Sequence, residues 1–197
     1  MLSEERINAN YLMFINKLQK YNCYSEEMMN EMGERIKNAS YSLSLDFGGA
    51  YRGGLIDITL NVLCKVGYML NNNCMGATNG FPLLSVNNDM LMRVLLLVNI
   101  AKADMFTIQT NEYKRKNGMP YEFVDTRTKL KIGERSLFLC QKYGIKLEED
   151  EFEAFLSLDR EDDKGERFNS PLFTMVKATK MFTLVQIHQK YLDDKNN

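Results

Sequence analysis

The sequence predicts a mainly α-helical bundle with one small β-hairpin. Apolar residues recur at helical spacing through most of the 197 residues, and suitable capping residues stand at the starts of these segments. The interval 105–128 has a different character, because two strand-like runs there flank Asn117-Gly118. This dipeptide is typical of a tight hairpin turn.

Two helices are expected before residue 40. Ser3 and Ser25 are suitable N-caps, and each is followed by two glutamates, which the positive end of a helix dipole favours. Each segment has one apolar face at helical spacing, formed by Ile7, Tyr11, Phe14, Ile15 and Leu18 in the first and by Met28, Met32 and Ile36 in the second. Such a methionine stripe is typical of a core rather than of a cofactor site.

A glycine-rich loop at 40–54 separates these helices from the rest. No Gly-Lys-Ser/Thr follows the glycines, which excludes a P-loop. A helix is expected from about Leu55 to Leu70, and asparagine-rich sequence then breaks it. The next helix, capped by Asn88 or Asp89, runs from Met90 to Ala101 and is apolar on nearly every side, so we expect it at the centre of the fold.

The hairpin should pair residues 107–113 with 119–124 and project from the helical body. Three further helices are expected after it, at 133–143, at 148–158 and from Ser170 onward. Gly144 suits the end of the first, and Pro171 suits the first turn of the last. The charged segment 159–169 should be an exposed loop.

The sequence contains no linker that would divide it, so we expect one domain over 1–197. It comprises N-terminal helices at 1–39, a core at 40–185 that includes the hairpin at 107–124, and a polar C-terminal tail at 186–197.

Composition narrows the classes of partner. The net charge of −1 gives no long-range field that attracts nucleic acid or an anionic membrane, and no apolar run is long enough to span a bilayer. We therefore expect neither as a partner. The four cysteines form no Cys-x-x-Cys pair and the chain has one histidine, which disfavours a zinc site. Cys64 and Cys140 lie in apolar helical stretches, so we expect them to be buried as small apolar residues. The N-terminus does not have the pattern of a signal peptide, so a cytoplasmic location is expected.

Several short motifs occur in a characteristic order. They are Tyr51-Arg52-Gly53-Gly54-Leu55, Leu60-Asn61-Val62, the apolar helix that ends in Lys102, Gly133-Glu134-Arg135-Ser136, and Tyr143-Gly144-Ile145. In this order residues 40–185 resemble the HD-domain phosphohydrolases, and most closely the branch common in bacteriophage and bacterial genomes. The resemblance implies a helical fold in which histidines and aspartates hold one or two divalent metals. Such metals polarise a phosphoryl oxygen and activate a water molecule.

The metal-ligand positions that the resemblance implies carry other residues in this chain: Ile58, Val98, Asn99, Ile132 and Leu158. A further aspartate position falls near Thr179 or Lys180. Isoleucine, valine and leucine cannot ligate a metal, and an asparagine offers only one neutral carbonyl oxygen. The prediction is therefore a frame without catalytic residues, metal or cofactor, in which the former cavity closes as an apolar core.

Five polar residues of the motifs remain: Arg52, Asp57, Lys102, Glu134 and Arg135. The resemblance places the positions of Arg52 and Lys102 near a phosphate site, so Arg52, Lys102 and Arg135 are candidates for binding a phosphate or nucleotide without cleaving it. The alternative is that these residues form ion pairs that stabilise the fold. The single histidine, His188, is either an acid–base group or an exposed or locally bonded helix residue, and the second role is the more ordinary one.

These observations lead to three functional hypotheses. The first is a phage-encoded, catalytically inactive HD-fold protein that binds another protein as a virion component, an assembly factor or an inhibitor of a host protein. It would act in the host cytoplasm or in the virion, through the 107–124 hairpin or the 159–169 loop. The second is a nucleotide-binding module without hydrolysis, and the third is an active phosphohydrolase with relocated ligands.

Overall fold

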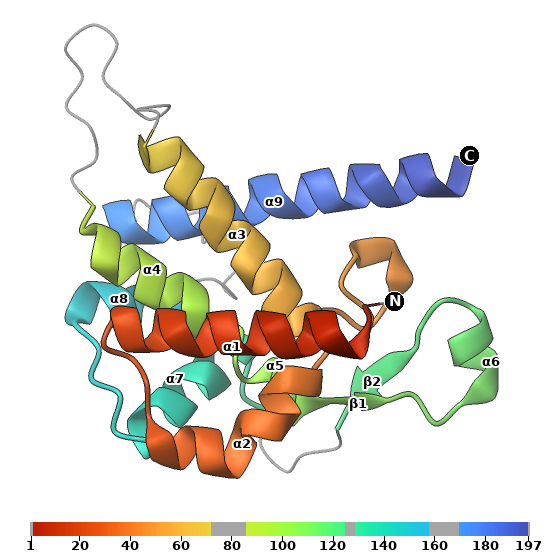
Figure 1. Ribbon diagram of the computed structural model, residues 1–197, viewed down its shortest axis with the longest axis horizontal. Coiled ribbons are helices and arrows are strands. Elements are labelled where there is room, and N and C mark those ends of the chain that lie inside the picture. The colour runs from red at the N-terminus through yellow and green to blue at the C-terminus, as the bar shows by residue number, and fades with distance from the viewer. Residues whose placement is uncertain (1, 72–85, 125–128, 158–169, 197) are drawn as a thin grey trace, which may run out of the picture.

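Helices dominate the computed structural model of the chain (Figure 1), which describes residues 2–71, 86–124, 129–157 and 170–196. Within these ranges one two-stranded antiparallel sheet accompanies them. The structure is thus mainly α with one small hairpin, as the sequence predicts. None of the described helices combines the length and apolar character that a membrane crossing requires.

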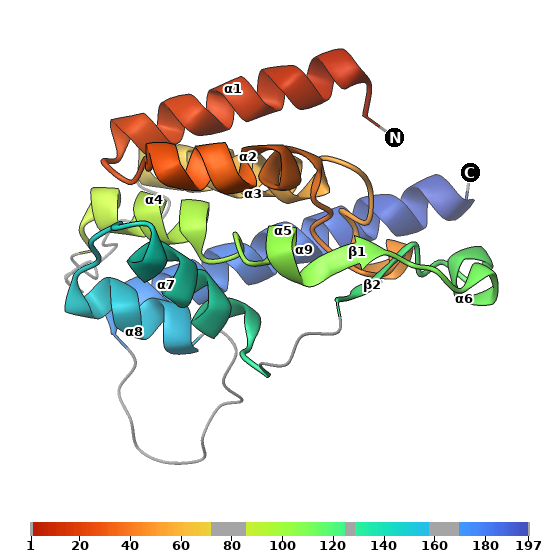
Figure 2. The same cartoon turned by 90° about the horizontal axis from the view of Figure 1, so that it is seen from below.

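The first two helices, α1 (Glu4–Lys20) and α2 (Glu26–Asn38), begin at the predicted caps. The Ser3 hydroxyl accepts from the Arg6 N–H at 3.3 Å, and the Ser25 hydroxyl accepts from the Met28 N–H at 3.4 Å. Both helices bury the predicted apolar faces against α3 (Gly54–Asn71). Figure 2 shows α1 on one side of the molecule, α7 and α8 on the other, and α4 between them.

The apolar helix α4 (Asn88–Leu97) is buried almost all round, as predicted, but its ends differ from the prediction. Its cap is Asn87, whose side-chain oxygen accepts from the Asp89 and Met90 N–H groups. It ends at Leu97, and tight turns bonded from residue i to i−3 follow through 98–101. These turns lead into the short helix α5 (Lys102–Met105).

The hairpin is present, but the predicted two-residue turn at Asn117-Gly118 is wrong. Strands β1 (Phe106–Ile108) and β2 (Tyr121–Phe123) pair antiparallel, and the short helix α6 (Glu112–Lys116) lies between them. The Asn111 side chain caps this helix by accepting from the Lys114 N–H at 3.2 Å. Asn117 and Gly118 end the helix instead of forming the strand-to-strand turn.

The C-terminal part contains α7 (Ile132–Lys142), α8 (Glu149–Ser157) and α9 (Pro171–Asn196). Ser170 caps α9 as predicted, because its hydroxyl accepts from the Phe173 N–H at 3.2 Å. Residues 186–196 form the last turns of this helix, so the described part of the predicted polar tail is helical. The predicted loop at 159–169 lies outside the described residues.

Buried apolar side chains from α1, α2, α3, α4, α7, α8 and α9 form one cluster. The expectation for Cys140 is confirmed, whereas Cys64 is exposed on α3 and that expectation is wrong. Cys64 stands in a mostly apolar stretch of sequence, but helix geometry turns this position away from the cluster.

Candidate functional site

A pocket of about 540 Å³ lies beside residues 180–189 of α9. This volume lies within the range of small-molecule sites. Its other walls come from the loop at 41–48, from α5 and β1, and from the first residue of α7. The lining residues are Tyr41, Ser42, Phe47, Lys102, Phe106, Ile132, Lys180, Leu184, Val185, His188 and Gln189.

Of the positions implied as former metal ligands, the structure describes residues 58, 98, 99 and 132. Ile58, Val98 and Asn99 are buried, and Ile132 is half-buried and forms part of the pocket wall. Leu158 lies outside the described residues. Of the two alternatives in the last helix, Thr179 is buried and Lys180 lines the pocket. Ile58 and Val98 thus join the core as predicted, but a pocket remains at Ile132.

The Tyr41 side chain lies near both Ile58 and Lys102. The backbone loop at Gly49 packs against both Tyr41 and Ile58, since a Cβ atom at Gly49 would lie 2.7 Å from the Tyr41 Cβ and 3.0 Å from the Ile58 Cγ1. The Lys102 Nζ lies 3.4 Å from the centroid of the Tyr41 ring. Burial raises the pKa of the Tyr41 hydroxyl far above its ordinary value.

The Asn99 amide offsets part of this increase in pKa, so it also lies near the Tyr41 hydroxyl. The contact does not have the geometry of a hydrogen bond: both the Tyr41 hydroxyl and the Asn99 carbonyl oxygen are buried without a partner among the described residues. Tyr41 cannot be identified from the sequence, because nothing in its local pattern shows that distant residues converge on its ring.

Lys102 is the one predicted phosphate-binding residue that lines the pocket. It is only 7% exposed, and its ammonium group lies over the Tyr41 ring with the Phe106 ring centroid 6.0 Å away. The negative face of an aromatic ring stabilises a cation in this position. A buried positive charge therefore forms part of the pocket wall.

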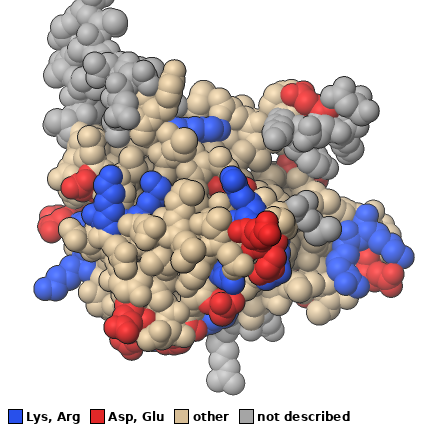
Figure 3. All heavy atoms as spheres, viewed as in Figure 1, with Lys and Arg blue, Asp and Glu red and all other residues tan. Residues whose placement is uncertain are grey.

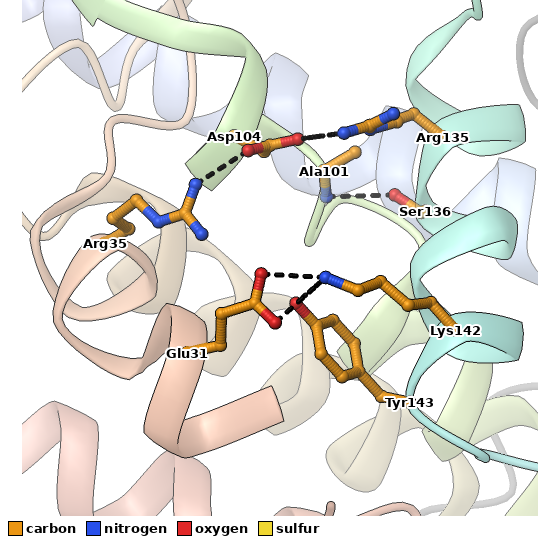
Figure 4. A network of polar contacts seen from close by, with 8 residues as sticks. All are labelled: Glu31, Arg35, Ala101, Asp104, Arg135, Ser136, Lys142 and Tyr143. Carbon is orange, nitrogen blue, oxygen red and sulfur yellow. Dashed lines mark hydrogen bonds and ion pairs between the residues drawn. The ribbon is translucent and has the colours of Figure 1, made fainter. Parts of the chain in front are cut away.

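The other two predicted phosphate-binding residues are held in ion pairs. Arg135 bonds Asp104 through Nη2 at 2.5 Å and Nε at 3.1 Å, and Arg35 bonds the other oxygen of Asp104 at 2.7 Å (Figure 4). Arg52 forms a two-pronged pair with Glu4 at 2.6 and 3.1 Å. This geometry favours the stabilising role that the sequence left open for both arginines.

Residues of the Gly133–Ser136 motif form hydrogen bonds that cap α7 and join it to the preceding turns. Glu134 caps the helix by accepting from the Lys131 N–H at 2.9 Å. The Ser136 hydroxyl accepts from the Ala101 N–H at 3.1 Å, which ties the turns at 98–101 to α7 (Figure 4). This buried bond fixes the turn that carries Asn99 and leads into Lys102.

His188 is an exposed residue of α9, as expected, but its bond is not local. Its Nδ1 lies 2.7 Å from the Asp46 carbonyl oxygen. Because a carbonyl oxygen can only accept, Nδ1 carries the proton of this bond. The bond holds the short 3₁₀ helix η1 (Leu45–Phe47) against α9 and places Phe47 at the rim of the pocket.

Comparisons with protein-family models, curated proteins and solved structures find no match to the chain. The resemblance to HD phosphohydrolases therefore stays a prediction from the sequence motifs. Among the described side chains, no three His, Cys, Asp or Glu residues gather in a group that could hold a metal ion. The site offers apolar walls, two lysines, one histidine and an amide.

Proposed function

We propose that the chain is a non-catalytic protein with an HD-like helical frame, and that it acts by binding another protein through its hairpin. The resemblance is to a branch common in bacteriophage genomes, so the proposed partner is a virion protein, an assembly intermediate or a host protein. The proposal that the chain is non-catalytic rests on residue chemistry. Side chains that cannot ligate a metal, Ile58, Val98 and Ile132, stand at positions where the family's metal ligands are implied.

The observation that supports the binding role is the hairpin, which extends away from the helical body together with α6 (Figure 1). Ile108 is 66% exposed and Tyr113 is 77% exposed. Exposed aromatic and aliphatic side chains on a projecting part of the chain are typical of protein-binding surfaces.

Charged groups flank these apolar side chains. Lys114, Arg115 and Lys116 follow Tyr113 in α6, and Figure 3 shows basic and acidic side chains together at this end of the molecule. Lys116 pairs with Glu112 at 2.9 Å. An apolar centre with a charged rim is the usual composition of an interface between proteins that also exist apart.

Affinity capture from the native source tests the proposal. The purified chain should retain one partner in stoichiometric amount, and the variant Ile108→Ser/Tyr113→Ser should lose it. Leu12→Ser/Met13→Ser is the matched control, because these two α1 residues are 63% and 49% exposed. Equal retention by the hairpin variant would place the interface elsewhere.

The pocket bears on the second hypothesis, nucleotide binding without hydrolysis. Lys102 and Lys180 line it and could meet a phosphate, but its walls are mostly apolar, and Arg52 and Arg135 pair with carboxylates. The geometry therefore supports nucleotide binding less well than a role in protein binding. The third hypothesis, an active phosphohydrolase, predicts stoichiometric divalent metal in the purified protein and metal-dependent release of phosphate from nucleotides.

A further inference from the structure

One face of α9 is both apolar and exposed. Thr179 and Thr183 are buried on the side of the helix that packs against the rest of the chain. On the other side, exposed large apolar side chains form what we call the α9 stripe, which consists of Met181, Phe182, Val185 and Leu192. At about 100° per residue, Met181, Val185 and Leu192 lie within about 40° of one another around the helix axis.

The sequence of the α9 stripe is unusual for the surface of a protein. The segment from Met181 to Gln189 contains no aspartate, glutamate, lysine or arginine. A helix at the surface of a globular protein normally turns charged and polar residues toward water. The composition of this face therefore suits a helix that another protein surface covers.

The exposed Phe47 ring adjoins the α9 stripe. Phe47 and Val185 both line the pocket beside α9, and the bond between His188 and the Asp46 carbonyl oxygen holds this part of η1 against the helix. The walls of the pocket are formed mainly by aromatic and aliphatic side chains. Exposed rings and an apolar recess thus occur on the same surface.

The exposed area matches that of a dimer interface. The four side chains of the α9 stripe and Phe47 are between 36% and 69% exposed. Since a large side chain has a total surface of about 150–250 Å², the five together leave about 500 Å² of apolar surface in contact with water. A standard interface covers about 800 Å² on each partner, and about 65% of it is apolar in homodimers, which again gives about 500 Å².

Three features favour a second copy of this chain over a different partner. A two-fold contact needs a surface that complements itself, and this surface carries both projecting rings and a recess. A charge near the two-fold axis would meet its own copy, whereas residues 181–189 carry no formal charge. The C-terminal half of α9 also extends past α3 at the edge of the molecule, which leaves room for a second helix (Figure 1).

We propose that the α9 stripe and Phe47 form a two-fold interface between two copies of this chain. Helix α9 packs against α9 of the second copy, with Val185 near the axis because it lies in the middle of the stripe. The contact also covers the Phe47 ring at the edge of the pocket. It is separate from the hairpin surface proposed for another protein, and neither contact depends on the other.

Sedimentation equilibrium of the full-length chain over micromolar concentrations tests the proposal. We expect a reversible monomer–dimer equilibrium with a micromolar or lower dissociation constant. Val185→Asp should raise this constant about 100-fold, because two carboxylates at the axis would lose water and repel each other. Leu12→Asp is the matched control, since Leu12 of α1 is 63% exposed and Val185 is 66% exposed; it should dimerise as the wild type does.

Chemical cross-linking gives a second readout that does not depend on the stability of Val185→Asp. In a Cys64→Ser background, which removes the exposed native thiol, Val185→Cys should form a disulfide-linked dimer when diamide oxidises the two thiols. Leu12→Cys in the same background should stay monomeric on a denaturing gel. The hairpin variant Ile108→Ser/Tyr113→Ser should dimerise normally, so that a failure of either proposal is recognised by itself.

Several outcomes would overturn the proposed dimer. These are a wild-type chain that stays monomeric throughout, a Val185→Asp variant that dimerises as the wild type does, and equal cross-linking of Val185→Cys and Leu12→Cys. The wild type should not sediment with vesicles of phosphatidylcholine and phosphatidylglycerol. Vesicle binding that Val185→Asp abolishes would assign the α9 stripe to a membrane surface instead. A different protein retained by the monomeric wild type, but not by Val185→Asp, would assign the stripe to that protein.

Discussion

Gly49 fixes the position of the Tyr41 ring. Its φ angle is +76°, a conformation that glycine adopts without strain, and its carbonyl oxygen accepts from the Tyr41 N–H at 2.9 Å. The absence of a side chain lets the loop approach both Tyr41 and Ile58. Because Lys102 rests on the Tyr41 ring, this one residue helps to set the geometry of the pocket.

Gly49→Ala should destabilise the protein by about 2–4 kcal/mol, from backbone strain and from overlap with the Tyr41 Cβ. Gly118→Ala is the matched control, because Gly118 also has a positive φ of +81° but no atom lies within 4 Å of an added Cβ. It should lose only the strain energy, about 1 kcal/mol. Urea unfolding measures both values, and equal losses would show that contact with Tyr41 is unimportant.

The free energy of unfolding should depend on pH in the alkaline range because two thiols are buried. Burial raises the pKa of Cys23 and of Cys140 from the ordinary value of 9.0 to about 12. Between these values the unfolded chain releases the two protons and the folded chain retains them. The unfolded state therefore binds fewer protons, and stability falls as pH rises above 9.

The expected loss is about 1.4 kcal/mol per thiol for each pH unit above 9, until pH approaches 12. The measurement is urea unfolding at pH 8, 9 and 10 for the wild type and for Cys23→Ala/Cys140→Ala. The variant should lose less stability over this range, because other groups that titrate there are common to both proteins. Parallel pH profiles would contradict the assignment, as would alkylation of Cys23 or Cys140 as fast as that of the exposed Cys64.

At the scale of elements, a buried ion pair joins α4 to α8. Arg93 donates from Nε to Glu151 at 2.7 Å and from Nη2 to the other carboxylate oxygen. That second oxygen also accepts from the Glu148 N–H at 2.9 Å, so Glu151 caps α8 as well. The Glu151 side chain is fully buried. Pairing with this carboxylate raises the pKa of Arg93.

Arg93→Met should cost about 3–5 kcal/mol, because it leaves the Glu151 charge buried without its partner. Arg93→Met/Glu151→Leu should be more stable than Arg93→Met alone, since the double variant removes the unpaired charge. Lys142→Met is a control, because the Lys142–Glu31 pair at 2.7 Å lies at the surface (Figure 4) and its loss should leave the unfolding midpoint nearly unchanged. A double variant less stable than Arg93→Met would contradict this account.

The elements that sequence predicts best are those specified by local signals. Ser3, Ser25 and Ser170 cap helices as expected, because a cap acts over three residues. The end of α4 at Leu97 was not predictable in this way, since the turn beyond it is held by Ser136 of α7. The helix inside the hairpin was missed because Asn117-Gly118 suits a helix end as well as a hairpin turn.

The residues of the candidate site divide in the same way, into those that local sequence predicts and those whose places depend on distant contacts. The motifs pointed to Lys102 and Ile132, and both line the pocket. Tyr41 and His188 were missed as pocket residues because their places depend on contacts between distant segments, such as the His188 bond to Asp46. Local periodicity places a residue on an element, but it does not show which residue of another element it will meet.

At the scale of the whole molecule, the pocket and the hairpin share strand β1. Phe106 lines the pocket, and its ring packs edge to face with Phe123 of β2 at 5.1 Å between centroids. The C-terminal half of α9 and the hairpin lie at the same end of the molecule (Figure 1). The surface proposed for a protein and the pocket therefore share strand β1.

The resemblance to HD phosphohydrolases can be tested by restoring ligands. In Ile58→His/Val98→His/Asn99→Asp, three buried positions receive the side chains that the family's pattern implies. Without metal the variant should be less stable than the wild type by several kcal/mol, because it buries polar groups without partners. If the three side chains meet, Mn²⁺ or Zn²⁺ at 100 times its dissociation constant should restore about 2.7 kcal/mol.

The control Leu63→His/Leu95→His/Leu96→Asp places the same side chains at other buried positions of α3 and α4. It should be destabilised similarly and gain nothing from metal, since nothing directs its three substitutions toward one point. Thermal unfolding with and without metal, after refolding in its presence, compares the two variants. A metal-dependent gain limited to the first variant would support an HD-like frame. Equal behaviour would mean that the motifs reflect helix packing alone, because an HD-like frame must bring residues 58, 98 and 99 within reach of a single ion.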